Sequence, residues 1–301
     1  YIEGTKQNPI TLTAMEPIGN HKIIKTKLEC EYFVMKHVSV INGLVSSYQT
    51  DNHFQNVIFN NDQLLEWNYA VVRTWFGKLL IEDCIINGIN QGEGVLVHNC
   101  QNAVVRNCEF NKVPDAVEYL NCKNSSIYNN VFNDMNDDGI DLNNCHQVSI
   151  YNNEFYNVGD RGLEIGSENM GSSGALSIYN NLFSGCNIAI NVKESSNAVV
   201  ENITFYDNNV NIELITPNDS TRISNLQISK SIFVGDNANI DRDMRSELSI
   251  INCSSEVELG FSNTNTVGPI LLSDPDNSDY TLQSATLPEG LLLQEIGYWK
   301  Q

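Results

Sequence analysis

Short segments of alternating apolar and polar residues recur along the middle of the chain at a nearly constant interval. The clearest copies end in Phe: VVRNCEF (104–110), SIYNNVF (126–132), SIYNNEF (149–155), SIYNNLF (177–183) and VVENITF (199–205). The successive intervals are 22, 23, 28 and 22 residues. A period of this size indicates a solenoid, and the alternation favours strands over helices, whose apolar positions recur every three or four residues.

A second set of alternating segments interleaves with the first, so each period holds at least two strands. These segments are GEGVLVHNC (92–100), DAVEYLNC (115–122), DGIDLNNC (138–145), RGLEIGSE (161–168) and AINVKES (189–195). Three strands of four or five residues plus their turns need roughly 22 residues at the strand rise. The period therefore predicts one coil of a three-sided parallel β-helix, an all-β fold.

Residues one period apart should stack in files along the axis of such a helix. The expected inward files are Ile127, Ile150 and Ile178; Phe110, Phe132, Phe155, Phe183 and Phe205; and the amides of Asn130, Asn153 and Asn181, which can hydrogen-bond from coil to coil. Cys100, Cys122 and Cys145 form a further file. Their parallel side chains are poorly aimed for disulfides, so we expect free, shielded thiols.

The pattern predicts a single domain with three parts. Residues 1–61 read as less regular N-terminal coils and 62–267 as regular coils. Residues 268–301 carry the clustered prolines and Tyr298–Trp299, and we expect this segment to cap the last coil.

The amino-acid composition disfavours several classes of binding partner. With 37 acidic and 17 basic residues the chain carries a net charge of −20, which repels nucleic acid and anionic lipid. No run of about 18 apolar residues exists, so no membrane insertion is expected. The first ten residues lack the basic and apolar regions of a signal peptide, which is compatible with a processed or excised segment.

Acidic residues gather in three successive coils, and the period brings them into register. The set is Asp115 and Glu118 in one coil, Asp137, Asp138 and Asp141 in the next, and Asp160 and Glu164 in the third. Carboxylates about 5 Å apart repel and need a cation, protonation or wide exposure to coexist. Calcium suits such oxygen ligands; the alternative is a set of solvated surface charges.

On these residues the chain resembles the right-handed parallel β-helix proteins of the pectate lyase-like superfamily, which includes polysaccharide lyases, hydrolases and epimerases. The NPITLTA opening, the IYNNxF coils and the closing DPDNSDYTLQSATLPEG (274–290) carry the resemblance over nearly the whole chain. The resemblance implies a right-handed helix, an acidic or neutral polysaccharide as partner, and a secreted or cell-surface location. Such motifs define the fold and leave the function to the site.

The acidic cluster resembles the calcium site of the family nine pectate lyases. Carried over, that resemblance implies Asp115, Asp137, Asp138 and Asp141 as calcium ligands. The family's catalytic lysine stands in a Gly-x-Lys-x-Gly setting, whereas the matching segment 162–166 has Glu164 at that position.

Two other residues could replace the missing base. Lys193 follows Asn191, which continues the file of Asp141 and Glu164, and Arg161 lies in the file of Asp138. A lyase needs a base within reach of the proton α to the uronate carboxylate, and a cation that neutralises this carboxylate. The alternative is that Arg161 is a counter-ion for the acids and Lys193 a surface lysine.

Glu164, Tyr119 and His98 flank the cluster and are the predicted substrate contacts. Two function classes follow. The first is a polysaccharide-active enzyme, a calcium-dependent lyase on uronate-containing glycans, although hydrolase or epimerase chemistry would use similar groups. The second is a non-catalytic carbohydrate- or calcium-binding module of a larger cell-surface or adhesion protein.

Overall fold

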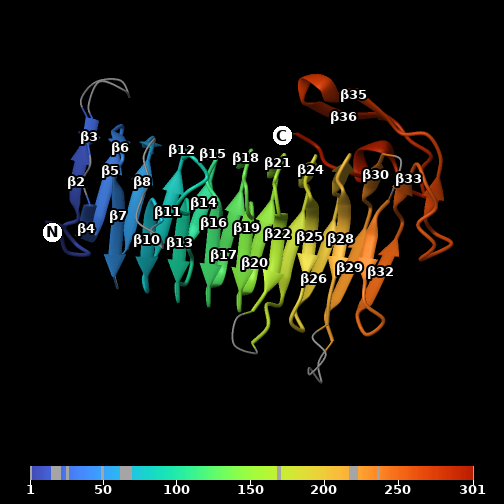
Figure 1. Ribbon diagram of the computed structural model, residues 1–301, viewed down its shortest axis with the longest axis horizontal. Coiled ribbons are helices and arrows are strands. Elements are labelled where there is room, and N and C mark those ends of the chain that lie inside the picture. Colours follow the sequence, from blue (N-terminus) through green and yellow to red (C-terminus); the bar gives the residue numbers. More distant parts are fainter. Residues whose placement is uncertain are drawn as a thin grey trace.

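The computed structural model describes residues 2–14, 22–24, 27–48, 51–61, 70–167, 171–216, 223–235 and 238–300. Its strands wind through three long parallel sheets, so each coil contributes one strand to each sheet. Figure 1 shows the coils stacked along the long axis of the molecule. In the described ranges the only helical elements are two three-residue 3-10 turns, which confirms the all-β prediction.

Sheet A carries the acidic segments on its outer face. Its eleven strands, in spatial order, are β1 (Ile2–Glu3), β4 (Lys27–Glu31), β7 (Leu44–Tyr48), β10 (Val72–Trp75), β13 (Val95–His98), β16 (Val117–Leu120), β19 (Ile140–Asn143), β22 (Arg161–Gly166), β25 (Ile188–Val192), β28 (Val210–Leu214) and β31 (Ile240–Arg242).

Sheet B follows sheet A in each coil. Its strands are β2 (Ile10–Thr13), β5 (Phe33–Lys36), β8 (Asn52–Gln55), β11 (Leu79–Glu82), β14 (Val104–Arg106), β17 (Lys123–Tyr128), β20 (His146–Tyr151), β23 (Leu176–Tyr179), β26 (Asn197–Glu201), β29 (Asn225–Ser229) and β32 (Glu247–Ile251).

Sheet C completes the coil with shorter strands. They are β3 (Lys22–Ile24), β6 (Ser39–Ile41), β9 (Ile58–Asn60), β12 (Ile85–Asn87), β15 (Glu109–Asn111), β18 (Val131–Asn133), β21 (Glu154–Tyr156), β24 (Leu182–Ser184), β27 (Thr204–Tyr206), β30 (Ile232–Val234), β33 (Ser254–Ser255) and β34 (Thr266–Val267).

The interior is built from the predicted files. The phenylalanines at 110, 132, 155, 183, 205 and 233 stack with ring centroids 4.5 to 5.9 Å apart between neighbours. Ile127 pairs with Ile150, and Ile150 with Ile178. All eight cysteines are buried and free, as expected.

The paired asparagines of the IYNN segments have different tasks. Asn152 takes a left-handed backbone with φ of 56°, which Asn adopts more readily than most residues, and so turns the chain between sheets B and C. Asn153 points inward, where its amide donates to the carbonyl of Ile127 and to Oδ1 of Asn181, both at 3.0 Å. The predicted amide ladder is confirmed.

The N-terminal coils are more regular than the sequence suggests. Strands β1 to β9 pair in the same three sheets as the later strands, so the described residues of 1–61 form ordinary coils. Residues 62–69 lie outside the described residues.

Much of the C-terminal segment, which the sequence analysis expected to cap the last coil, lies along sheet C. A hairpin of β35 (Leu271–Asp274) and β36 (Asp279–Ser284), joined by the 3-10 turn η1 (Pro275–Asn277), folds back beside sheet C, and a second turn, η2 (Leu293–Glu295), follows. Tyr280 and Tyr298 pack against Leu182 and Ile232 of sheet C. Leu259, nearer the end of the coils, joins the main core instead.

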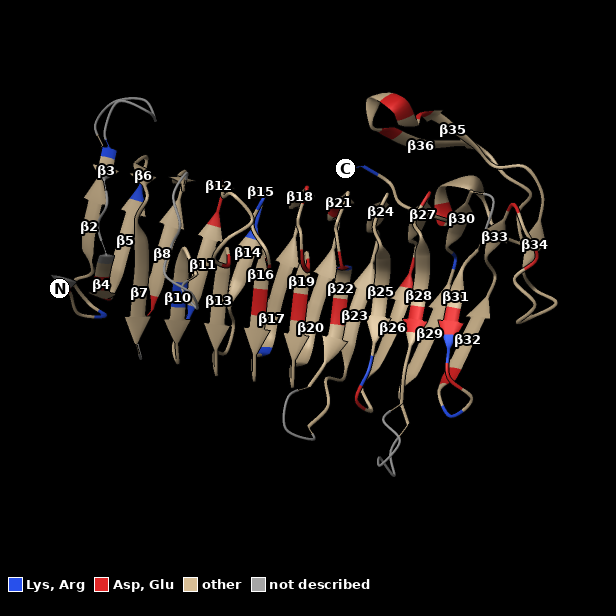
Figure 2. Cartoon of the chain, viewed as in Figure 1, with Lys and Arg blue, Asp and Glu red and all other residues tan. Residues whose placement is uncertain are grey.

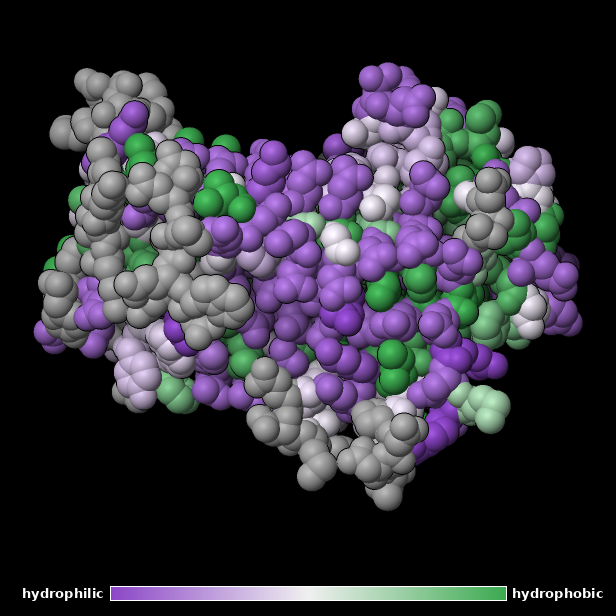
Figure 3. Space-filling view, in the orientation of Figure 1, coloured by the Kyte–Doolittle hydropathy of each residue, from purple (hydrophilic) through white to green (hydrophobic). Residues whose placement is uncertain are grey.

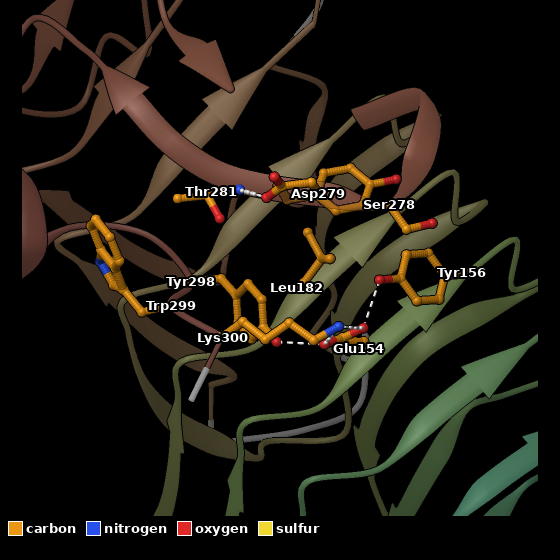
Figure 4. A pocket seen from close by; sticks show the side chains of 10 residues that line it. Glu154, Tyr156, Leu182, Ser278, Asp279, Thr281, Tyr298, Trp299 and Lys300 are labelled. Atoms are coloured by element: carbon orange, nitrogen blue, oxygen red, sulfur yellow. Dashed lines mark hydrogen bonds and ion pairs between the residues drawn. The ribbon is translucent and has the colours of Figure 1, made fainter. Parts of the chain in front are cut away.

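Figure 4 shows how this segment is fastened around a cavity of about 100 Å³. The hydroxyl of Tyr298 donates to Oε1 of the buried Glu154 at 2.6 Å, and the hydroxyl of Tyr156 donates to Oε2 at 2.7 Å. The ammonium of Lys300 lies 3.0 Å from Oε1. Glu154 therefore ties the chain terminus to β21.

Candidate functional site

The acidic site lies on the outer face of sheet A, and strand register creates it. Glu118 of β16 pairs with Asp141 of β19, which pairs with Glu164 of β22. The same file continues through Asn191 to Glu213. Figure 2 shows these acidic positions as red bands across neighbouring strands, and Figure 3 shows hydrophilic side chains over the middle of this face.

A second row of acids runs along the turn that enters sheet A. Oδ1 of Asp115 accepts a hydrogen bond from the backbone N–H of Asp138 at 3.1 Å. Oδ1 of Asp138 in turn accepts from the backbone N–H of Arg161 at 2.9 Å. These bonds aim each carboxylate at the next coil, so the two rows meet at Asp138.

The predicted metal ligands come together as overlapping groups. Asp115, Asp137 and Asp138 form one group, and Asp138, Asp141 and Glu164 form another, each with ligand oxygens within 4.8 Å of one another. A third group, of Glu93, Asp115 and Glu118, contains one acid that the sequence analysis missed. Glu93 stands 22 residues before Asp115, so the repeat itself contained the signal.

Burial makes these carboxylates hard to ionise together. Asp138 is 4% exposed and Asp141 8%. Burial, with the charges of neighbouring acids, raises the pKa of Asp115 to about 7 and that of Asp138 to about 8. Burial and the nearby Glu164 also raise the pKa of Asp141 well above its usual value. The nearby basic groups therefore do not supply enough positive charge to keep all of these carboxylates ionised.

One buried oxygen identifies where a cation would fit. Oδ2 of Asp141 accepts a hydrogen bond from Nδ2 of Asn143 at 2.8 Å, but Oδ1 is buried without a hydrogen-bond partner among the described residues. All donors of the group with Asp138 and Glu164 are carboxylate oxygens, the ligands that calcium prefers. The residues thus fit a hard divalent cation.

The two predicted basic residues meet at Glu164. Nζ of Lys193 lies 2.5 Å from its Oε1, and Nη1 of Arg161 lies 2.8 Å from its Oε2. Arg161 also reaches Oδ2 of Asp160 at 2.7 Å and Oδ1 of Asp138 at 3.8 Å. Lys193 and Arg161 are partly exposed, so both side chains can contact a molecule bound on the outer face of sheet A.

Their protonation follows from these contacts. Burial opposes the charge of Arg161, but Glu164, Asp138 and Asp160 outweigh burial and raise its pKa. Burial likewise opposes the charge of Lys193, whereas the hydrogen bond and charge of Glu164 raise its pKa. Arg161 stays protonated whether or not it is paired with Glu164. Lys193 can lose its proton more easily than Arg161 when its ion pair with Glu164 is broken.

The two aromatic rings predicted to contact substrate lie on opposite faces of sheet A. Tyr119 is fully buried in the interior, so it cannot stack on a sugar, and that prediction is wrong. Strand alternation explains it, since an outward Glu118 requires an inward neighbour. His98 faces outward, half-buried, with its ring stacked 5.3 Å from that of Trp75. Burial, with the charge of Arg73, lowers the pKa of His98 to about 4.

Comparison with known proteins identifies the fold. A family model described as "Right handed beta helix region" matches residues 42–175. No curated protein matches the chain. In the described part of the chain, no helix has the length and apolar character needed to cross a membrane.

Similar solved structures include several alginate lyases. A variant of AlyGC, a family 6 alginate lyase, has a TM-score of 0.64 at 15% identity over 99% of this chain and 51% of its own. The alginate lyase AlyF-OU02 has a TM-score of 0.61 at 10% identity, covering 96% and 84%. A mannuronic acid specific family 6 polysaccharide lyase from human gut microbiota has a TM-score of 0.58 at 12% identity, covering 92% and 83%.

This chain therefore spans about half the length of AlyGC. At such identities the likeness concerns the fold alone. The chain is a right-handed parallel β-helix, which confirms the fold expected from the sequence.

Proposed function

We propose that this protein is a calcium-dependent lyase that cleaves a uronate-containing glycan on the outer face of sheet A. The proposed cation ligands are Asp115, Asp137, Asp138 and Asp141, which Glu164 can join through the group that it forms with Asp138 and Asp141, and the proposed base is Lys193. The observation that carries this proposal is the position of Nζ of Lys193, 2.5 Å from a carboxylate of the group formed by Asp138, Asp141 and Glu164.

The charges of the protein and of the site indicate the class of substrate. A net charge of −20 disfavours an anionic polymer unless basic groups and a cation receive it locally. Arg161 and Lys193 supply the basic groups at the acidic cluster. The similar structures support this choice, because two are alginate lyases and one is specific for mannuronic acid, a uronate. A polymeric glycan as substrate implies a secreted or cell-surface location.

Bound calcium would neutralise the uronate carboxylate and so make the proton at the neighbouring carbon more acidic. The residues of the chain do the rest. The neutral amine of Lys193 takes the proton from C5, and the released electron pair forms the C4–C5 double bond. The C4–O bond breaks, and the leaving oxygen is protonated by water. One unsaturated uronate end and one new hydroxyl end result.

Arg161 has a different role in this proposal. Its guanidinium remains charged and offers several N–H donors, so it suits binding and orienting a carboxylate better than removing a proton. His98 is uncharged near neutral pH and half-buried beside Trp75, so we assign it to contact with the glycan at a distance from the chemistry.

The test is an ultraviolet assay for unsaturated uronate ends with alginate, pectate and glucuronate-containing polymers, each with calcium and with chelator. We expect product with at least one polymer, only when calcium is present. Absence of product from every polymer under both conditions would contradict the lyase.

A non-catalytic module is the second candidate, and one observation favours it. Glu164 stands where the related family has its lysine, and it holds Lys193 as a charged partner. In that case the glycan, acidic or neutral, would bind without cleavage. Glycan binding measured by calorimetry, without product in the assay above, would establish the module.

A further inference from the structure

Glu164 contacts two basic side chains and also belongs to a group of carboxylates that could bind a cation. Glu164 is 5% exposed, and its side chain points outward from β22 between Asp141 and Asn191. One carboxylate oxygen pairs with Lys193 and the other with Arg161. The same carboxylate also belongs to the group with Asp138 and Asp141.

The space around Lys193 favours this pairing. A Cβ at Gly166 would lie 2.8 Å from Cε of Lys193, so the absence of a side chain there lets the lysine fold back over β22. Glycine at this position therefore makes room for the ion pair.

A divalent cation at the group of Asp138, Asp141 and Glu164 would lie beside the ammonium and the guanidinium. Like charges at such distances in a partly buried site repel strongly. The cation would also compete directly for the oxygens of Glu164. Binding must therefore loosen the pairs that Glu164 makes with Lys193 and Arg161.

We infer that Glu164 is an exchangeable counter-ion that holds Lys193 and Arg161 in the cation-free protein and passes to the cation on binding, which releases both basic side chains to receive a carboxylate of the glycan. This inference rests on the proposed function and adds its regulation. By linkage, the cation and an acidic ligand should each strengthen binding of the other.

The experiment follows the Lys193 amine directly and needs no glycan. The whole protein is acetylated with N-acetoxysuccinimide, with calcium or with chelator, and rate constants at individual lysines are read by mass spectrometry. Exposed Lys123, on sheet B, is the internal reference. Calcium binding is measured in parallel by calorimetry, and circular dichroism checks that each variant is folded.

In the wild type, calcium should raise the Lys193 rate at least about fivefold, the low end for coupled sites, without changing Lys123. In Glu164→Gln, which keeps the shape but removes the charge, Lys193 should react fast with chelator already and gain nothing from calcium. In Asp141→Asn, which keeps Glu164, Lys193 should react slowly under both conditions.

Calcium binding that leaves the Lys193 rate of the wild type unchanged would overturn the exchange while leaving the cation site standing. A slow Lys193 in Glu164→Gln would overturn it as well. A wild type that binds no calcium would overturn the exchange together with the cation site. The lyase is judged separately by the product assay, so an inactive protein with the expected labelling would still support the exchange.

Discussion

Nζ of Lys193 and Oε1 of Glu164 lie 2.5 Å apart, although Lys193 follows β25 and Glu164 belongs to β22 of the preceding coil. The pair crosses from one coil to the next on the face that carries the acids. It places Lys193, the proposed base, directly beside the candidate cation ligands.

If Lys193 is the base, Lys193→Ala should reduce turnover on the best glycan at least about 10²-fold, the low end for a positioned acid or base. Arg161→Ala should instead weaken substrate binding and raise KM, because Arg161 orients a carboxylate. Initial rates of double-bond formation measure both. Lys123→Ala, on sheet B, is the matched control and should keep wild-type kinetics; equal turnover in Lys193→Ala would contradict the assignment.

Calcium should stabilise the folded protein, because a ligand that binds the native state alone raises the melting temperature by mass action. The rise should be lost in Asp138→Asn, since Asp138 belongs to two of the carboxylate groups. Asp276→Asn, at an exposed residue of η1, should retain it. Melting curves with calcium and with chelator decide the matter, and identical curves for the wild type would identify the acids as surface charge.

Without calcium, stability should fall as the pH rises. The pKa of Asp115 is raised from 3.8 to about 7 and that of Asp138 from 3.8 to about 8 in the folded chain. The folded state therefore binds more protons than the unfolded state between about pH 4 and pH 8, and loses this advantage as the pH rises through that window. Melting in chelator at several pH values checks the slope.

Calcium should flatten this pH profile, because bound cation replaces the missing positive charge. Asp138→Asn should flatten it in part, with or without calcium. A chelated wild type whose melting temperature is constant across the window would show that the acids are more hydrated than their burial indicates.

The asparagine ladder should be costly to interrupt. Asn153→Ala removes the acceptor of the backbone N–H of Asn130 and the donor to the carbonyl of Ile127, both buried. Each unsatisfied buried group costs about 1–3 kcal/mol, so urea should unfold the variant at a clearly lower concentration. Asn187→Ala, at an exposed position, should change the midpoint little. Equal midpoints for the two variants would show that the interior supplies other partners.

The repeat determined much of what could be predicted. Because parallel strands pair in register, a spacing of 22 or 23 residues is enough to place Asp141 beside Glu118 and Glu164. The same spacing would have found Glu93, and strict alternation would have turned Tyr119 inward. Residue type alone does not give the direction of a side chain from its strand, so a choice by type omits Glu93 and includes Tyr119.

Other features had no periodic signal. The C-terminal segment does not repeat, so its length and composition indicate that it covers apolar surface without indicating which surface. Sheet C offered Leu182 and Ile232 on its outer side, and the segment packs there. The pairing of Lys193 with Glu164 likewise depends on the direction of a long side chain over Gly166, which register alone does not specify.

The contact between Tyr298 and Glu154 joins residues 144 positions apart. In a solenoid each coil otherwise contacts only its neighbours, so coils can unwind one at a time from an end. The coils that follow β21 cannot unwind one at a time in this way, because Tyr298 is bound to Glu154 of β21. They can separate only after this hydrogen bond breaks. The coils between β21 and the C-terminal segment should therefore come apart together, whereas coils outside this span can separate one at a time.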